Sequence, residues 1–165
     1  MYLIRHGRPA RTGVLLGSTD TPLAGEPISP SNLEVNFVFS SPLQRARRTA
    51  ELLFPDRDIA VLPELAERGL GDWEGKRWEE IEAAWPDAAA RASADWFGEK
   101  PPGGESWEEF TARVNRAWIR IRASSVCAVV AHAGVNAVLR HFATGADFVS
   151  FRQDYCEVIS IAIPD

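Results

Sequence analysis

VCAVVAHAGVNAVLRHFA, residues 126–143, carries the strongest structural signal in this sequence. Its first six residues form an uninterrupted apolar run, which is typical of a strand covered on both faces. His132 follows directly, and the remaining residues predict a helix from about Ala133 to Ala143. A buried strand that leads at once into a helix is the repeating unit of a parallel sheet with helices packed on it.

The same alternation of strand and helix patterns extends over the rest of the chain, without repeats or long linkers. We therefore expect an α/β fold. It should be a single three-layer domain over residues 1–165, with a mostly parallel sheet covered by helices on both faces. The expected strands are 2–4, 37–39, 59–62, 126–131 and 157–163, and the expected helices are 42–54, 78–85, 88–97, one that begins after Ser106, and 133–143.

Two helix starts carry capping signals. Ser41 precedes Pro42, which suits the first helical position, and Gln44 would complete a capping box. Ser106 and Glu109 form a second box ahead of the longest helical pattern. Both boxes predict where a helix begins.

Composition restricts the class of protein. Hydrophobic residues make up 45% and charged residues 25% of the 165 residues, as in ordinary globular domains. No apolar run reaches the roughly 18 residues of a membrane span, and the formal charge of -5 argues against a general nucleic-acid binder. Cys127 and Cys156 lie in apolar, strand-like stretches, which suits reduced core thiols. We expect a soluble cytoplasmic protein that binds neither nucleic acid nor membrane.

Polar side chains follow three of the expected strands. Ligands of open α/β sheets bind beyond the carboxyl ends of the strands, so these side chains are candidates for a common site. If the first strand and strand 126–131 are neighbours, His6 and His132 face each other across one crevice. The three groups are Arg5-His6-Gly7, Ser40-Ser41 with Arg45, and His132-Ala133-Gly134.

The same crevice suits an anion. Helices that begin near Pro42 and Ala133 would direct free backbone N–H groups toward it. Arg45 lies one turn into its helix and should reach back to the same point, because helical side chains lean toward the N-terminus. Arginine favours phosphate oxygens through its planar fork, and Gly7 lets the chain leave the strand close to the anion.

Six motifs together resemble the histidine phosphatase superfamily, the phosphoglycerate-mutase-like group. They are IRHGRP, GSTDTPL, SSPLQRARRTAELL, LAERGLGDWEG, PPGGES and VVAHAGV, in that order, and the resemblance runs from residue 3 to about 140. Within the superfamily, the short chain and the GGES turn are most similar to α-ribazole phosphatases and other small phosphatases.

The resemblance implies a chemistry for each candidate residue. His6 would be the nucleophile that becomes a phosphohistidine, and Glu67 would protonate the leaving oxygen. The substrate would be a small phosphorylated metabolite, with α-ribazole 5'-phosphate as a candidate, and neither cofactor nor metal would be required. The implied catalytic set is His6, Glu67, Arg5, Arg45 and His132, and the implied substrate-binding set is Arg5, Gly7, Thr12, Arg45, His132 and Ala133.

Elementary chemistry agrees with this implication. An imidazole attacks phosphorus only when it is neutral, and the cations around His6 disfavour its protonated form. The same cations can stabilise the charge that develops on the phosphoryl oxygens, which is the task a metal ion performs in other phosphatases. Histidines at 6, 132 and 141 show no metal-ligand spacing, and His141 receives no role.

The sequence departs from the family pattern at two places. The family often reads RHGxTxxN, but Pro9 and Thr12 stand at the last two specified positions, which weakens the case for Thr12 as a phosphate contact. The family usually has a full helix before the second strand. Here only 26–36 bridges that distance and contains Pro27 and Pro30. The shortened connection would leave a sheet edge either more exposed or covered by a partner subunit. The second alternative would make the protein a homodimer.

Two other functions are compatible with the same motifs. A phosphoglycerate mutase would use the same histidine but shield its phosphoenzyme from water, and the sequence ends at Asp165 without a covering tail, which favours hydrolysis. A non-catalytic phospholigand-binding module would usually lack His6 or Glu67.

Glu74 competes with Glu67 as the acid, although a loop-structuring role suits it better. Trp107 follows helical spacing and is expected in the core, whereas Trp73 should pack beneath the site.

Overall fold

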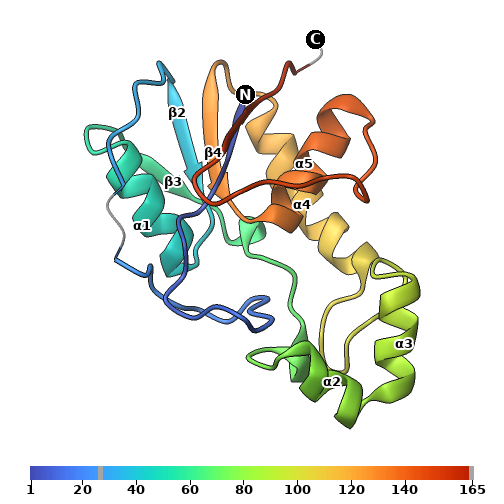
Figure 1. Ribbon diagram of the computed structural model, residues 1–165. Coiled ribbons are helices and arrows are strands. Elements are labelled where there is room, and N and C mark those ends of the chain that lie inside the picture. Colours follow the sequence, from blue (N-terminus) through green and yellow to red (C-terminus); the bar gives the residue numbers. More distant parts are fainter. Residues whose placement is uncertain (26–27, 164–165) are drawn as a thin grey trace.

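The computed structural model describes residues 1–25 and 28–163 and confirms the expected α/β class (Figure 1). Five strands form one sheet in the order β3-β2-β4-β1-β5. β4 pairs in parallel with β1 and β2, β2 pairs in parallel with β3, and β5 runs antiparallel to β1. The strands are β1 Tyr2–Arg5, β2 Phe37–Ser40, β3 Ile59–Val61, β4 Cys127–Ala131 and β5 Val158–Ser160.

The central strand β4 explains the uninterrupted apolar run in the sequence. All five of its residues are buried. Val129 belongs to the cluster on one face of the sheet, and Val130 belongs to the cluster on the other. Successive side chains of a strand point to opposite faces, so a strand covered on both sides has no polar position.

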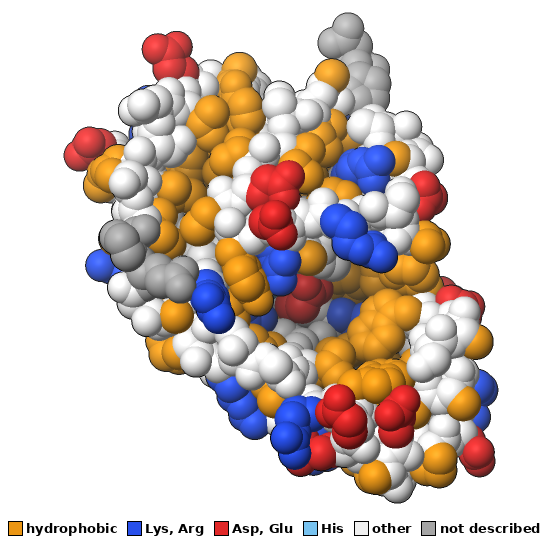
Figure 2. Space-filling model, viewed as in Figure 1, with side chains coloured by type: hydrophobic (Ala, Val, Ile, Leu, Met, Phe, Trp, Pro, Cys, Tyr) orange, Lys and Arg blue, Asp and Glu red, His pale blue; other side chains and the backbone are white. Residues whose placement is uncertain are grey.

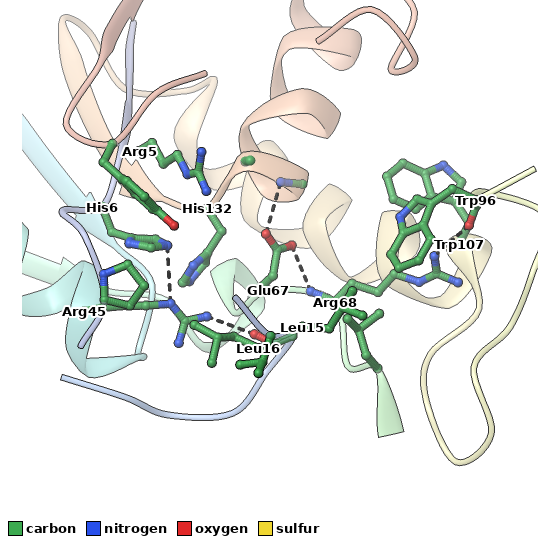
Figure 3. Close-up of a pocket in the computed structure, with 17 residues that line it drawn as sticks. Arg5, His6, Leu15, Leu16, Arg45, Glu67, Arg68, Trp96, Trp107 and His132 are labelled. Atoms are coloured by element: carbon green, nitrogen blue, oxygen red, sulfur yellow. Dashed lines mark hydrogen bonds between the residues drawn. The ribbon is translucent and has the colours of Figure 1, made fainter. Parts of the chain in front are cut away.

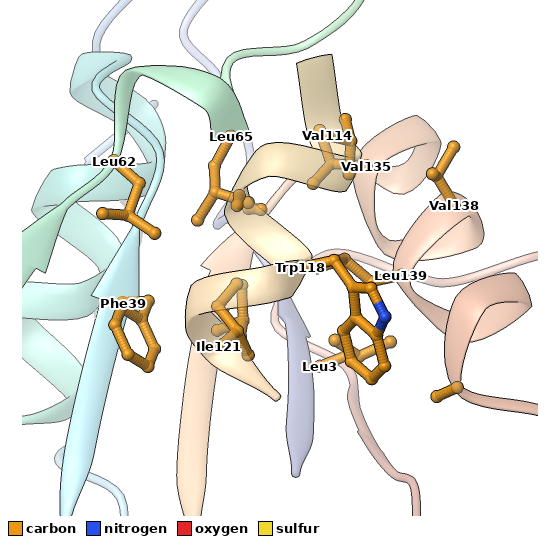
Figure 4. Packing of buried hydrophobic residues seen from close by; sticks show 14 of the residues in the cluster. Leu3, Phe39, Leu62, Leu65, Val114, Trp118, Ile121, Val135, Val138 and Leu139 are labelled. Atoms are coloured by element: carbon orange, nitrogen blue, oxygen red, sulfur yellow. The ribbon is translucent and has the colours of Figure 1, made fainter. Parts of the chain in front are cut away.

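Helices cover both faces, as expected. α1 (Gln44–Leu53) packs on one face, and α4 (Trp107–Ile121) and α5 (Ala133–Thr144) pack on the other (Figure 1). Each helix presents its apolar stripe to the sheet, which removes that surface from water. The larger cluster, shown in Figure 4, contains Leu3, Phe39, Leu62, Leu65, Val114, Trp118, Ile121, Val135, Val138 and Leu139.

Two further helices lie beyond the carboxyl ends of the strands (Figure 1). They are α2 (Trp78–Ala84) and α3 (Pro86–Ala94), and they share a small core of their own around Trp73. Trp73 is fully buried there and packs with Leu70 and Trp96, which line the pocket described below, so it lies beneath the pocket wall as predicted. α3 also begins earlier than expected, because Pro86 occupies its first turn, where a missing N–H costs nothing.

One capping box is confirmed and the other is wrong. The Ser106 hydroxyl accepts a hydrogen bond from the Glu109 N–H at the start of α4, and the Glu109 carboxylate accepts one from the Ser106 N–H. α1 begins at Gln44 rather than Pro42. The Asp20 carboxylate caps it by accepting bonds from the Gln44 N–H at 2.7 Å and from the Gln44 side-chain amide at 3.0 Å. The Ser41 hydroxyl accepts a hydrogen bond from the Leu43 N–H, one residue before the helix, at 3.2 Å.

The connection before β2 contains no helix over residues 28–36, and the remainder of the expected shortened segment, residues 26 and 27, lies outside the described residues. Val35 is buried, and Ile28 and Leu33 pack against the cluster beneath α1. This segment therefore covers part of the α1 face of the sheet. The homodimer stays a prediction.

Of the two cysteines, Cys127 is a buried core thiol, as expected, and Cys156 is not. Cys156 is half-buried in the turn before β5, with a left-handed φ of 61°. Neither cysteine forms a disulfide. No helix within the described residues has the length and apolar character needed to cross a membrane.

Candidate active site

The register of the sheet brings three strand ends to one point. Arg5 of β1 pairs with Ala131 of β4, so the next residues, His6 and His132, leave the sheet side by side. Their ring centroids lie 4.9 Å apart, and only 5% and 1% of their surfaces are exposed. The expected crevice between the two histidines therefore exists, and Figure 3 shows Arg5 and Arg45 beside it.

Hydrogen bonds fix the tautomer of His6. Its Nδ1 lies 2.6 Å from the Gly7 carbonyl oxygen, which can only accept a hydrogen bond, so Nδ1 carries the proton. Its Nε2 lies 3.3 Å from the Nε of Arg45, which can only donate. Nε2 therefore carries the lone pair, which accepts this bond from Arg45 at the edge of the pocket. This is the protonation pattern that a nucleophilic imidazole needs.

Both histidines are neutral near pH 7. The pKa of His6 is lowered to about 3, mainly by burial and also by the nearby charges of Arg45 and Arg5, while the hydrogen bond to Gly7 opposes the shift. Burial also lowers the pKa of His132 well below its usual value, with smaller contributions from His6, Arg45 and Arg5. A neutral His6 is available for attack over the whole physiological pH range.

His132 is held by Ser41, whose hydroxyl oxygen also accepts a hydrogen bond from the Leu43 N–H at 3.2 Å. Its Nε2 lies 2.7 Å from the Ser41 hydroxyl. Its Nδ1 is buried and has no hydrogen-bond partner among the described residues. A buried polar atom without a partner is costly, and a ligand oxygen would satisfy this one.

Arg45 reaches back from α1 to His6, as its helical position predicts. Its guanidinium donates to the Thr19 carbonyl at 2.7 Å and the Gly17 carbonyl at 2.9 Å, and 2% of the residue is exposed. Arg5 likewise donates to a carbonyl, that of Gln153, at 2.6 Å. Carbonyls orient a guanidinium without neutralising its charge, so two full positive charges remain at the pocket for an anion.

Glu67 enters the pocket from the opposite side, after a 3₁₀ turn at Pro63–Leu65 (Figure 3). Its two carboxyl oxygens accept hydrogen bonds from the N–H groups of Arg68 at 2.9 Å and Gly134 at 3.1 Å. Burial raises the pKa of this carboxyl, although those two bonds and the charges of Arg45 and Arg113 oppose the shift. A raised pKa favours the protonated form, which a general acid requires.

The helix N-termini differ from the expected arrangement. The first N–H of α1, that of Gln44, is bonded to Asp20, so this N–H does not bind an anion as expected. At α5 the Gly134 N–H is bonded to Glu67, while Ala133 lines the pocket. The helix ends thus organise protein carboxyl groups, and the arginine and histidine side chains supply most of the anion site.

Glu74 structures a loop, as the sequence favoured. Its carboxylate accepts hydrogen bonds from the backbone and hydroxyl of Ser18 at 2.8 Å each, the hydroxyl of Thr19, and the Leu70 N–H at 2.9 Å. Burial disfavours its charged form, but these bonds outweigh burial and lower its pKa. An ionised, fully occupied carboxylate is poorly suited to donate a proton.

The structure places two implied substrate contacts away from the pocket. Thr12 is exposed and does not line the pocket. Gly7 does not line the pocket either. Its N–H donates to the Thr49 hydroxyl at 2.8 Å, and a Cβ added to Gly7 would lie 2.7 Å from the Ile28 side chain. Gly7 thus serves close packing, while Arg5, Arg45, His132 and Ala133 do line the pocket with His6 and Glu67.

The pocket has a volume of about 330 Å³ and a second, apolar end that sequence reasoning did not place there. Leu15, Leu16, Trp96 and Trp107 form this end, and Trp107 is therefore not simply a core residue. Figure 2 shows the hollow, with charged side chains on its floor and hydrophobic side chains along one wall. No periodic pattern marks these residues as a group, because they come from separate loops and one helix start.

Arg68 anchors the aromatic wall and was also not foreseen. Its buried guanidinium donates to three carbonyl oxygens, those of Glu105 at 3.1 Å, Trp96 at 3.2 Å and Glu99 at 2.6 Å. The residue next to the candidate acid therefore ties the loop that carries Trp96 to the pocket. The fixed geometry of five guanidinium donors suits this role.

Comparison with known proteins identifies the family of this chain. A sequence model of the histidine phosphatase superfamily (branch 1) matches residues 1–165. The chain belongs to this superfamily. The adenosylcobalamin/α-ribazole phosphatase of Salmonella typhimurium is 32% identical over 154 residues, which cover 84% of this chain and 76% of the relative.

Solved structures of related proteins have the same fold as this chain. The crystal structure of the α-ribazole phosphatase from Shigella flexneri superposes with a TM-score of 0.84 at 27% identity, over 95% of this chain and 87% of that one. The phosphoglycerate mutase from Thermus thermophilus superposes with a TM-score of 0.67 at 36% identity, over 88% and 84%. The expected superfamily, its phosphatase class and its fold are confirmed, while similarity to both kinds of relative leaves the reaction to be argued from the site.

Proposed function

We propose that this histidine phosphatase hydrolyses a small phosphomonoester through a phosphohistidine on His6, without a metal ion. The observation that carries the proposal is the tautomer of His6, which leaves Nε2 unprotonated. His6 lines a pocket together with Arg5 and Arg45, whose charges are not neutralised by an ion pair among the described residues. His132 also lines it and has a nitrogen without a hydrogen-bond partner in that part of the chain, and Glu67 lies across from His6. A nucleophile, an anion site and an acid thus meet in one cavity.

In the first step, the substrate phosphoryl group would lie between Arg5, Arg45 and His132. Nε2 of His6 attacks phosphorus, a P–N bond forms, and the P–O bond to the leaving group breaks. Glu67 gives its proton to the leaving oxygen. The phosphorylated ring becomes cationic, and its Nδ1–H remains bonded to the Gly7 carbonyl, which stabilises that charge.

In the second step, water replaces the departed alcohol. Glu67, now a carboxylate, accepts a proton from this water as its oxygen attacks phosphorus. The P–N bond breaks, inorganic phosphate forms, and neutral His6 and protonated Glu67 are restored. The arginines stabilise the charge on the phosphoryl oxygens in both steps, so their contribution does not depend on the leaving group.

The apolar end of the pocket favours a leaving group with a flat apolar part. With phosphate at the charged end, that part would lie along Leu15, Leu16, Trp96 and Trp107. Tryptophan rings supply a large apolar area for stacking. α-Ribazole 5'-phosphate, whose base is a benzimidazole, is our candidate substrate.

Phosphate release from a panel of monoesters tests this function. The panel contains α-ribazole 5'-phosphate, 3-phosphoglycerate and nucleoside monophosphates, each measured before and after exhaustive EDTA treatment. We expect the highest kcat/KM for the ester with the flat base, and no loss after EDTA. Loss of activity after EDTA that added metal restores would contradict the metal-independent mechanism.

A mutase would give a different result with the same protein. With 3-phosphoglycerate and a bisphosphoglycerate primer, we expect isomerisation to be much slower than phosphate release from the best monoester, because the pocket is open to water. The reverse ratio would assign phosphoryl transfer instead. No turnover of either kind, with retained phosphate binding, would leave a binding module.

A further inference from the structure

Arg5 poses a positioning problem that the proposed reaction alone does not solve. A guanidinium on a flexible stem contributes to an anion site only if it is held in one orientation. Its Nη1 donates to the Gln153 carbonyl, while its Nε is buried without a hydrogen-bond partner among the described residues. The turn that supplies the Gln153 carbonyl therefore controls where Arg5 points.

That turn, residues 153–157, is bonded to the backbone of Arg5 from both sides. The Arg5 N–H donates to the Glu157 carbonyl at 3.2 Å, and the Cys156 N–H donates to the Arg5 carbonyl at 3.1 Å. Cys156 adopts a left-handed φ of 61°, a conformation that non-glycine residues rarely adopt unless their surroundings hold them there. The turn is thus shaped around the residue that it orients.

Two buried amides fix the turn in place. The Gln153 side chain donates to the carbonyls of Leu3 and Glu157, at 3.0 Å each, and accepts from the Asn136 amide at 2.9 Å. Gln153 is 5% exposed and Asn136 is fully buried in α5, one turn after His132. The pair therefore joins β1, α5 and the turn, which are the elements that carry Arg5 and His132.

Tyr155 supplies the second contact to the guanidinium. The Arg5 Cζ lies 4.1 Å from the centre of the Tyr155 ring. A planar guanidinium can stack on an aromatic face while its N–H donors point outward in its own plane. The ring covers one face of Arg5 and leaves the in-plane Nε–H for a phosphoryl oxygen.

We propose that Gln153, Asn136 and Tyr155 are positioning residues for Arg5, and that this cluster sets the affinity of the site for the phosphoryl group. The inference rests on the proposed function for its biological meaning. Its test does not, because binding of inorganic phosphate can be measured without turnover.

The experiment compares Kd for inorganic phosphate by calorimetry. Tyr155→Leu should raise Kd about five-fold, as loss of one cation–π contact predicts, and Tyr155→Phe should recover most of the affinity. Gln153→Met should raise Kd about ten-fold or more, because the carbonyl that orients Arg5 loses its anchors. Phe37→Leu, which changes a half-exposed aromatic residue on β2, is the matched control.

Repeating both substitutions in an Arg5→Lys background separates positioning from general damage. If the cluster acts through the guanidinium, each substitution should change Kd by less than about two-fold there, since residues that act as one unit are not additive. Equal losses of phosphate affinity in both backgrounds would overturn the proposal. An unchanged Kd for Tyr155→Leu would also overturn it. Tyr155 is 40% exposed, so this variant should fold even if Gln153→Met does not.

If the unaltered protein binds no phosphate, both the proposed anion site and the proposed role of the cluster are wrong.

Discussion

The two ends of the pocket are built in different ways. At the charged end, His6 and His132 follow paired strands, and Arg45 extends from a helix that packs on the same sheet. At the apolar end, Leu15 and Leu16 lie in a long loop, and Trp96 lies in the segment between α3 and α4. The first end inherits its geometry from the register of the sheet. The second depends on loop contacts such as those of Arg68.

This difference assigns the two ends separate tasks. Attack on phosphorus needs atoms placed within a fraction of an ångström, which regular elements provide. Selection of a leaving group needs only a shaped apolar surface, and loops can vary without disturbing the sheet. Substitutions at the charged end should therefore affect every substrate, and substitutions at the apolar end should affect only some.

The largest expected effect is at His6. His6→Ala removes the nucleophile and should lower kcat on the order of 10⁴–10⁶-fold for every monoester, as removal of a nucleophile does in other enzymes. The fold should persist, because the backbone bond from the His6 N–H to Ala131 does not involve the side chain. Steady-state phosphate release measures the loss of kcat, and circular dichroism shows whether the fold persists. A variant that turns over at even a tenth of the original rate would contradict the mechanism.

The next effect separates the acid from the anion site. Glu67→Gln should slow hydrolysis of an alkyl phosphate about 10²–10⁴-fold and affect para-nitrophenyl phosphate far less, because a good leaving group needs little protonation. The measurement is kcat/KM for both esters.

Glu74→Gln is the matched control for this acid. It breaks a loop network and should lower stability without any dependence on the leaving group. If Glu74→Gln shows that dependence, or if Glu67→Gln loses the same factor on both esters, the assignment of the acid is wrong.

A smaller effect is expected at the apolar end. Trp107→Ala should lower kcat/KM about 3–10-fold for esters with a flat aromatic leaving group, as loss of one aromatic contact predicts, and leave glycerol phosphate nearly unaffected. Trp85→Ala, a tryptophan of the α2–α3 junction that does not line the pocket, controls for lost stability. An equal loss on both classes of ester would remove the distinction between the two ends.

The last effect is on stability rather than on activity, and it comes from the pKa of His6. The folded pKa of about 3 lies below the unfolded value of 6.5, so the unfolded state binds more protons between these values. This histidine therefore stabilises the fold fully above pH 6.5, and its contribution is lost as the pH falls toward 3. Denaturant unfolding should show a slope up to ~1.4 kcal/mol per pH unit steeper in the original protein than in His6→Ala. Equal slopes would show that His6 titrates normally.

The sheet and the charged end could be predicted because the sequence marks them locally. The apolar run before His132 specifies a central strand. The parallel pairing of β1 with this strand, Arg5 opposite Ala131, then places His6 beside His132. The prediction of the α1 cap was wrong because the capping carboxylate belongs to Asp20, which lies 24 residues before Gln44 in the sequence, and no local pattern identifies such a partner. Local signals thus give the elements, while contacts between distant loops refine their ends.

The apolar end and the Arg5 cluster show what sequence patterns miss. Trp107 sits at a helical spacing that indicates core, yet its place at the first residue of α4 exposes it to the pocket. Gln153 and Tyr155 fall in a stretch without periodicity, and their importance follows only from contact with Arg5, almost 150 residues earlier. Such contacts are tertiary and leave no periodic trace.

The most direct test of the central claim is to trap the phosphoenzyme. A rapid acid-free quench with ³²P-labelled substrate, followed by peptide mapping, locates the label. We expect one phosphohistidine, at His6, stable in base and labile in acid, and absent from His6→Ala. A label on another residue, or burst-free turnover with no phosphoenzyme in a protein that releases phosphate, would contradict attack by His6.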